Sequence, residues 1–261
     1  MSIKKILLLT ALCLAWLLCL AGETLNMFVD YNRFLDKDKQ TVLLLDYQIP
    51  YRNLAFVAKE GGYFAELDVN VEFIHADSIC MKQEVRDNIG VSNKADTSSK
   101  SKSYLNRLSF VLDNCASDIR FTAVDVNSQK SFSWLFNVQK LPPNSILSDL
   151  ELNSEVRPDT LQYLAKFHRN KTLYRSEPSI LINRSATDFA YLYLEIYSDG
   201  VSATDSNLLN LSLERDSIIV MDDYLDYSPK KAVEGFSLKI PLKELSLGKY
   251  NGSVTLQSGE K

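Results

Sequence analysis

Short stretches in which apolar and polar residues alternate recur along most of the chain, and turn-forming residues separate them. The clearest stretch covers residues 63–75, where every second residue is apolar. A period of two is typical of a half-buried β-strand. Before it, residues 42–58 predict a nearly continuous apolar strand, a break at Pro50 and a short strand, and Gly61-Gly62 supplies the next turn.

The same pattern continues to the end of the sequence and contains almost no helical periodicity. Residues 92–103 predict an exposed loop, and residues 156–168 predict a linker with one or two helical turns. Many short strands joined by turns favour an all-β fold of two tandem immunoglobulin-like β-sandwich domains, residues 24–154 and 155–261. The predicted strands are residues 27–34, 41–48, 54–58, 63–75, 79–86, 104–112, 119–126, 131–138, 146–152, 172–175, 179–183, 189–198, 208–214, 218–221, 235–240 and 250–256.

The N-terminus has the composition of a secretory signal peptide. Lys4 and Lys5 precede an apolar segment, residues 6–20, and small residues follow it. This order of charged, apolar and small residues predicts a cleaved signal peptide over residues 1–22. We therefore expect an exported, secreted protein that resides in the periplasm, in the cell envelope or outside the cell.

Two other membrane attachments are disfavoured at this end. Lipid attachment at Cys19 is disfavoured because Leu18 stands where a small residue is required, and an uncleaved anchor is disfavoured because the apolar segment is short. We expect no transmembrane segment after signal cleavage.

The charge of the chain argues against two classes of partner. The formal net charge is −4, and it becomes −6 once the segment with Lys4 and Lys5 is removed. Because phosphate neutralisation needs clustered Lys or Arg, an acidic chain without a basic run is not expected to bind nucleic acid. For the same reason it lacks a polybasic patch for anionic membranes.

Export would leave two cysteines, Cys80 and Cys115. In a simple antiparallel meander, the turns near these residues fall at the same end of the sandwich. A disulfide between them is therefore a candidate, and two buried free thiols are the alternative.

We find no catalytic, cofactor-binding or metal-binding motif, and we expect a non-enzymatic protein without cofactors. The two histidines, His75 and His168, stand at a strand end and in a linker. Nucleophile elbow, zincin and phosphate-loop motifs do not occur in the sequence. The acidic cluster Asp222, Asp223 and Asp226 lacks the ligand spacing of a calcium loop and is interpreted as a solvated turn.

A row of tyrosines is predicted on one face of the strand at residues 189–198. Such a row could stack on sugar or dock a partner, but it more often packs under a neighbouring segment. The row consists of Tyr191, Tyr193 and Tyr197. N-glycosylation sequons, which matter only in a eukaryotic secretory pathway, begin at Asn170, Asn183, Asn210 and Asn251.

A structural motif is predicted near the C-terminus. Leu245, Gly248 and Tyr250 match the spacing of a tyrosine corner, which opens the penultimate strand of a Greek-key sandwich. The residues after that strand are mostly polar, so we expect the second sandwich to lack its last strand and to leave a sheet edge open. Either the chain is a truncated form of a longer protein, which we favour, or a protein partner in the envelope donates a strand.

Three stretches carry a resemblance to a known family: residues 45–67, residues 147–152, and residues 192–197 with the later Leu-x-x-Gly-x-Tyr segment. With these stretches the chain resembles the N-terminal region of GWxTD-domain-containing proteins, which are bacterial envelope proteins of the Bacteroidetes and Fibrobacteres neighbourhood. The GWxTD motif itself is missing, because neither Trp16 nor Trp134 follows a glycine. The resemblance implies an exported bacterial protein without an established catalytic role, and it carries over no functional residue.

The predicted function is an interaction or structural role in the cell envelope. One alternative is a periplasmic chaperone of the two-sandwich type, which also binds by strand addition but is usually basic around its cleft. Another is a carbohydrate-binding module that uses the tyrosine row.

Overall fold

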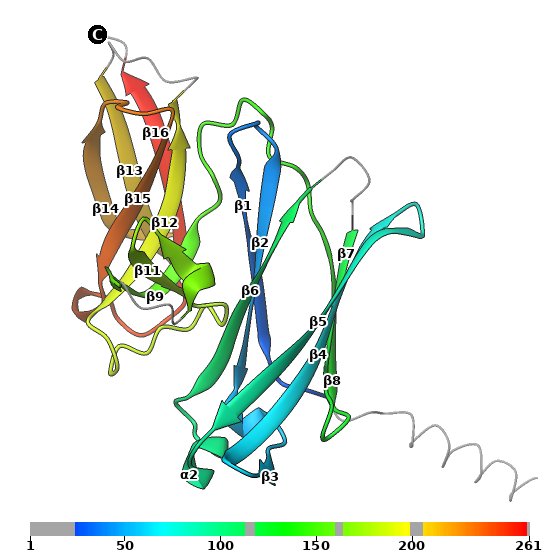
Figure 1. The fold of residues 1–261 in the computed structure, drawn as a ribbon. Helices are drawn as coiled ribbons and strands as arrows, with labels where there is room; N and C mark the ends of the chain where they lie inside the picture. The colour runs from blue at the N-terminus through cyan, green and yellow to red at the C-terminus, as the bar shows by residue number, and fades with distance from the viewer. Residues whose placement is uncertain (1–23, 113–117, 160–163, 199–205, 260–261) are drawn as a thin grey trace, which may run out of the picture. The chain divides into compact units, whose positions relative to one another are not determined.

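The computed structural model describes residues 24–112, 118–159, 164–198 and 206–259, and it is built almost entirely of β-strands (Figure 1). About 62% of the described residues are in strands and 6% in helices, which confirms the predicted all-β class. Several antiparallel sheets are present, as a β-sandwich fold requires. The predicted signal peptide, residues 1–22, lies outside the described residues. No helix among the described residues has the length and apolar character needed to span a membrane.

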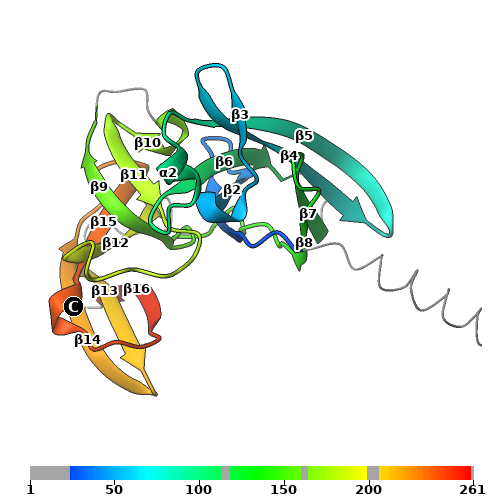
Figure 2. The same cartoon turned by 90° about the horizontal axis from the view of Figure 1, so that it is seen from below.

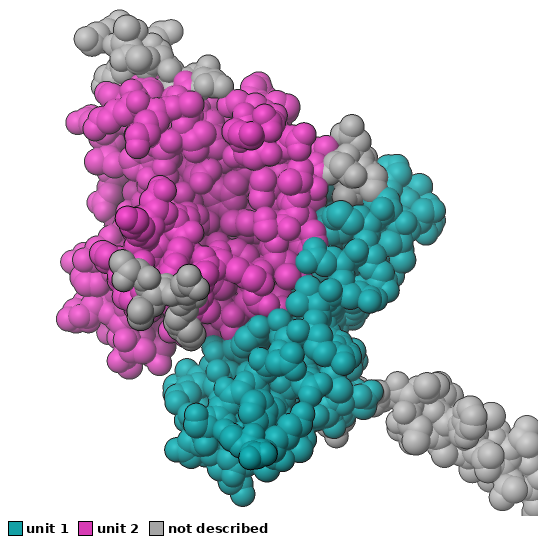
Figure 3. Space-filling view, viewed as in Figure 1, with its two compact units in different colours: residues 1–27, 49–104, 115–138 teal, residues 28–48, 105–114, 139–261 magenta. Residues whose placement is uncertain are grey.

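Contacts between Cα atoms divide the chain into two compact units (Figure 3). Unit 1 contains residues 1–27, 49–104 and 115–138, and unit 2 contains residues 28–48, 105–114 and 139–261. The predicted boundary between residues 154 and 155 falls inside one strand, β9 (Glu151–Pro158), so the compact units do not separate there.

Unit 1 is organised around one long hairpin, β4 and β5, which Figure 2 shows as a pair of adjacent ribbons. β4 pairs with β5 along one edge and with β3 and then β7 along the other, and β8 pairs with β7. The strands of this sheet are β3 (Val57–Lys59), β4 (Gly62–His75), β5 (Ser78–Val91), β7 (Asp118–Asp125) and β8 (Ser131–Asn137).

The alternation that predicted a strand over residues 63–75 is confirmed by the burial of β4. Leu67, Val69, Val71 and Phe73 are buried, and the residues between them are not. Because successive side chains of a strand point to opposite faces, one face of this sheet collects the apolar side chains.

Two local predictions in unit 1 are corrected. A strand was predicted over residues 54–58, but the strand observed here is β3, Val57–Lys59, which pairs with β4. A 3-10 turn, Tyr51–Asn53, precedes it. The segment 92–103, predicted to be irregular, contains the short helix α2 (Lys94–Thr97). The Asn93 side chain caps this helix by accepting a hydrogen bond from the Ala95 N–H, a local interaction that apolar periodicity does not reveal.

Unit 2 contains three sheets, whose strand orders are β1-β2-β6, β10-β11-β9-β12-β15 and β14-β13-β16. The last two sheets pack face to face as a sandwich, because apolar side chains of β12 and β13 share common cores. The strands are β1 (Phe28–Leu35), β2 (Thr41–Pro50), β6 (Ser103–Val111), β9 (Glu151–Pro158), β10 (His168–Arg169), β11 (Thr172–Ser176), β12 (Phe189–Tyr197), β13 (Ser206–Arg215), β14 (Ile218–Tyr227), β15 (Val233–Pro241) and β16 (Asn251–Gly259).

The predicted last strand of the first domain, residues 146–152, is wrong. The strand begins at Glu151, continues to Pro158 and pairs with β11 and β12. It therefore also replaces the start of the helical linker predicted over residues 156–168, of which the described residues retain one 3-10 turn, Ala165–Phe167. The pattern of apolar residues did not locate this strand, because the strand begins with Glu151, which is fully buried despite its charge.

Unit 2 holds a buried ionic network that involves four strands. Arg107 on β6 forms a bidentate pair with Asp46 on β2, with Nε–Oδ1 and Nη2–Oδ2 distances of 2.6 and 2.7 Å. The same guanidinium lies 3.1 Å from Oε2 of Glu151 on β9, which also accepts hydrogen bonds from Arg169 on β10. Asp46 and Glu151 are fully buried and Arg107 is 5% exposed. Burial by itself would raise the pKa of Glu151, but the two guanidinium groups hold it below its usual value.

Aromatic rings shield this network from water. Arg107 lies 4.5 Å from the centre of the Phe167 ring, and Arg169 lies 4.0 Å from the centre of the Tyr193 ring. Tyr174 packs edge-on against Tyr193 with ring centres 4.8 Å apart. These contacts add cation–π attraction to the ion pairs and keep the local dielectric low.

Replacement of Arg107 by Met should destabilise the protein by about 3 to 5 kcal/mol, because Asp46 would lose its only ion-pair partner in the network and Glu151 one of two. The measurement is urea unfolding at neutral pH followed by circular dichroism. Arg120→Met is the control, since Arg120 pairs with Glu72 at the surface and should cost less than about 1 kcal/mol. Equal losses in the two variants would contradict the importance of the buried network.

A second prediction concerns Asp30, which stands directly opposite Asp46 in the β1–β2 pairing. Burial raises the pKa of Asp30 to about 6, the Tyr31 N–H opposes this, and the carboxylates of Asp46, Glu151 and Asp149 add to it. The folded state therefore holds the proton more tightly than the unfolded state. Stability is lost as the pH rises from about 4 to about 6.

Asp30→Asn should remove this loss. We expect the variant to exceed the natural protein in unfolding free energy by on the order of 2 to 3 kcal/mol near pH 8, and to match it near pH 3. Unfolding curves across this pH range provide the measurement, and Asp38→Asn in the exposed β1–β2 turn is the control. A stability difference that does not change with pH would show that Asp30 does not titrate as described.

Candidate functional site at an open sheet edge

The sheet β14-β13-β16 of unit 2 ends in a strand, β16, whose outer side pairs with no described strand. β13 lies in the middle, so that Leu209 pairs with Leu225 of β14 on one side and with Leu256 of β16 on the other (Figure 1). No described strand pairs with the side of β16 that faces away from β13, and we call this side the β16 edge.

The β16 edge combines free backbone groups with an apolar inner face. In an antiparallel pair every second residue directs its N–H and C=O away from the partner strand, so these groups of β16 are available. Val254 and Leu256 pack into the cores between the two sheets. Thr255 and Gln257 are exposed on the opposite face. An arrangement of this kind can bind an additional strand through main-chain hydrogen bonds.

The predicted tyrosine-corner residues lie together at the start of β16. Leu245 packs against the core formed by β12 and β13. The Tyr250 hydroxyl donates a hydrogen bond of 2.6 Å to the Ser246 carbonyl, which is the backward bond that a tyrosine corner makes. A Cβ atom on Gly248 would lie 3.0 Å from the Arg215 side chain, so the glycine leaves room for that residue. We keep the interpretation of this segment as a tyrosine corner.

The predicted disulfide stays a prediction. Cys80 lies on β5, near the β4–β5 turn, and its Sγ is 3.4 Å from the Phe73 carbonyl oxygen. Cys115 lies outside the described residues.

The two histidines belong to different units. His75 is exposed at the end of β4 in unit 1. His168 belongs to β10 in unit 2, where its Nε2 lies 3.5 Å from Oδ2 of Asp159. Within the described part of the chain, no three or more His, Cys, Asp and Glu side chains gather closely enough to hold a metal ion.

The acidic cluster does not form a turn, contrary to the prediction. Asp222, Asp223 and Asp226 all lie on the edge strand β14. Asp222 accepts hydrogen bonds from the Asn210 amide at 2.6 Å and from the Tyr224 hydroxyl at 2.9 Å.

Of the four sequon asparagines, Asn210 is buried within the sheet, whereas the other three, Asn170, Asn183 and Asn251, are exposed.

The tyrosine row is covered rather than open. Tyr193 and Tyr197 are 5% and 1% exposed, and both hydroxyls donate to Glu195, at 3.0 and 3.3 Å. The Tyr197 hydroxyl also accepts a hydrogen bond of 2.7 Å from the Leu35 N–H. Only Tyr191 of the row is partly exposed. The row therefore packs under a neighbouring segment and offers sugar no flat aromatic surface.

Sequence reasoning missed the exposure of β14. The run Ile218, Ile219 and Val220 has the composition of a buried strand, yet these residues are 66%, 60% and 46% exposed. Four consecutive apolar residues, Ile218 to Met221, followed by two aspartates were the only signal in the sequence. Burial itself depends on which strands lie alongside.

No protein-family model matches this chain, and no curated protein matches its sequence significantly. The resemblance of residues 45–67, 147–152 and 192–197 to GWxTD-domain-containing proteins therefore remains an expectation, and the geometry of the sheet edges carries the functional assignment.

Proposed function

We propose that this protein is an exported, non-enzymatic component of a bacterial cell envelope that binds a protein partner at the β16 edge. The observation that carries the proposal is that β16 pairs with β13 on one side and with no described strand on the other. A strand with free backbone groups and an inward apolar face favours binding of an extended segment, because main-chain hydrogen bonds supply affinity without special side chains.

The composition of the β16 edge supports a protein ligand over a small molecule. Thr255 and Gln257 are neutral and exposed, and Val254 and Leu256 contribute to the core beneath. A partner strand would cover Val254 and Leu256 and would pair the outward N–H and C=O groups of β16.

Export and family are supported by the sequence alone. The charged, apolar and small segments of residues 1–22 follow the order of a signal peptide. The stretches at residues 45–67, 147–152 and 192–197 resemble the N-terminal region of GWxTD-domain-containing proteins. We therefore propose the periplasm, the envelope or the cell exterior as the location and membership of this family as the origin.

The test is photo-crosslinking in the native host from a benzoylphenylalanine placed at Thr255. The matched control carries the same group at Gln83, which is also exposed and lies on the edge strand β5 of unit 1. We expect the Thr255 position, and not the Gln83 position, to give one protein adduct in the envelope fraction. Mass spectrometry should map the adduct to a single extended segment of the partner.

Two results would overturn the proposal. The first is adduct formation of equal strength from both positions, which would show that exposure and not the β16 edge determines contact. The second is a protein that stays in the cytoplasmic fraction with residues 1–22 still attached, which would exclude export.

A further inference from the structure

β14 forms the opposite edge of the same sheet and is unusually apolar for an exposed strand. No described strand pairs with the side of β14 that faces away from β13, and we call this side the β14 edge. Five large apolar side chains of the strand are 46% to 66% exposed: Ile218, Ile219, Val220, Tyr224 and Leu225. An exposed apolar edge strand is a template for pairing with another chain.

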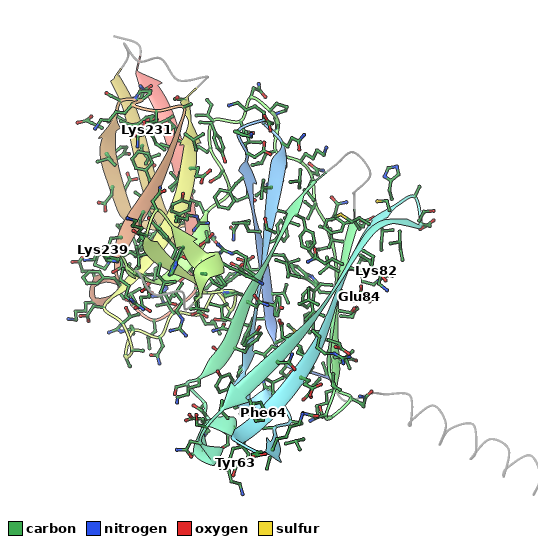
Figure 4. All side chains as sticks on the ribbon, viewed as in Figure 1. Tyr63, Phe64, Lys82, Glu84, Lys231 and Lys239 are labelled. Atoms are coloured by element: carbon green, nitrogen blue, oxygen red, sulfur yellow. The ribbon has the colours of Figure 1, made fainter. Side chains whose placement is uncertain are left out.

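The edge strand of unit 1 shows how this protein protects an edge elsewhere. On β5, Lys82 and Glu84, both labelled in Figure 4, form an ion pair at 2.6 Å. Arg86 forms a bidentate pair with Asp68 of the neighbouring strand, at 2.6 and 2.7 Å. Charges of both signs that are satisfied within the sheet discourage strand addition. β14 lacks such protection.

The charge on β14 is of one sign only. The strand carries Asp222, Asp223 and Asp226 and no Lys or Arg between Ile218 and Tyr227. None of the three carboxylates forms an ion pair with a described residue. Asp223 pairs in register with the core residue Leu211 and Asp222 with Ser212, so acidic side chains lie on both faces of the strand. A strand added to this edge would meet negative charge from either face.

This charge argues against a second copy of the chain as the occupant. Antiparallel pairing of two β14 strands would bring Asp222, Asp223 and Asp226 of one copy close to the same residues of the other. Like charges on paired strands destabilise the pairing. The same carboxylates would attract lysine or arginine on a different strand.

We propose that the β14 edge binds an extended segment of another protein in which aliphatic residues alternate with lysine or arginine. The segment pairs with the free backbone groups of β14, and its aliphatic side chains lie on the face of Leu225. Its cationic side chains lie on the opposite face, where they reach Asp222 and Asp226. This inference rests on β14 and stands whether or not the β16 edge is occupied.

Fluorescence anisotropy with three labelled ten-residue peptides, matched to the length of β14, tests the proposal. The first alternates Lys and Val, the second alternates Glu and Val, and the third is the Lys-Val peptide N-methylated at every residue, so that neither of its edges can donate. We expect the first to bind at least about tenfold more tightly than either of the others, because only it supplies both cations and a free hydrogen-bonding edge.

Two charge variants separate the β14 edge from the overall acidity of the protein. Asp222→Asn, Asp223→Asn and Asp226→Asn combined should weaken binding of the Lys-Val peptide about tenfold or more. The control combines Asp38→Asn, Glu60→Gln and Asp77→Asn, three exposed positions elsewhere, and changes the net charge equally without affecting binding. Both sets replace exposed carboxylates by amides of the same shape, so folding is preserved.

Several results would overturn the inference. These are no binding of the Lys-Val peptide up to about 1 mM, equal binding of the N-methylated peptide, or equal loss in both charge variants. Sedimentation showing a dimer that Ile219→Asp converts to monomer would identify a second copy as the occupant and would also exclude the proposed partner.

Discussion

The buried pairing of Arg107 with Asp46 and Glu151 is the interaction on which unit 2 depends. Arg107 comes from β6, Asp46 from β2 and Glu151 from the first position of β9, so one guanidinium joins two sheets. If the two sheets moved apart, the carboxylate of Asp46 or of Glu151 would be buried without the positive charge of Arg107. Because an unpaired buried charge is costly, the network restricts how the two sheets can lie. The network gives a physical reason why residues 28–48 and 105–114 group with residues 139–261.

The surrounding side chains are arranged to support that network. Arg169 places a second positive charge beside the carboxylate of Glu151. The ring of Phe167 covers the guanidinium of Arg107, and the ring of Tyr193 covers that of Arg169. Arg33 and Asp149 add a bidentate pair between β1 and the segment before β9, with distances of 2.8 and 2.9 Å. Charged and tyrosine side chains that would suggest a binding site from the sequence therefore stabilise the fold. The candidate binding surfaces are the sheet edges.

The edges of the sheets differ in how they are finished. β5 carries ion-paired side chains of both signs, whereas β14 carries exposed aliphatic residues and unpaired acids. β16 carries neutral residues over an apolar inner face. Since an unprotected edge favours aggregation, its presence on both sides of one small sheet is best explained by a partner that covers it. The proposed role as an interaction module follows from this difference between edges.

The sequence by itself determined the strand content and, within a single strand, which side chains share a face. The alternation over residues 63–75 predicted β4 because a period of two depends only on neighbours along the chain. The spacing of Leu245, Gly248 and Tyr250 predicted a hydrogen bond between residues four positions apart, which is also local.

Only the tertiary structure decided which strands became neighbours, and with them the burial of charge and the exposure of apolar residues. Glu151 is buried because Arg107 and Arg169, which lie 44 positions before it and 18 after it, converge on its carboxylate. Ile218, Ile219 and Val220 are exposed because no described strand lies outside β14. Both outcomes depend on contacts between segments that are distant in the sequence. Which buried charges find a partner, and which strand is left at an edge, is settled only when the sheets assemble.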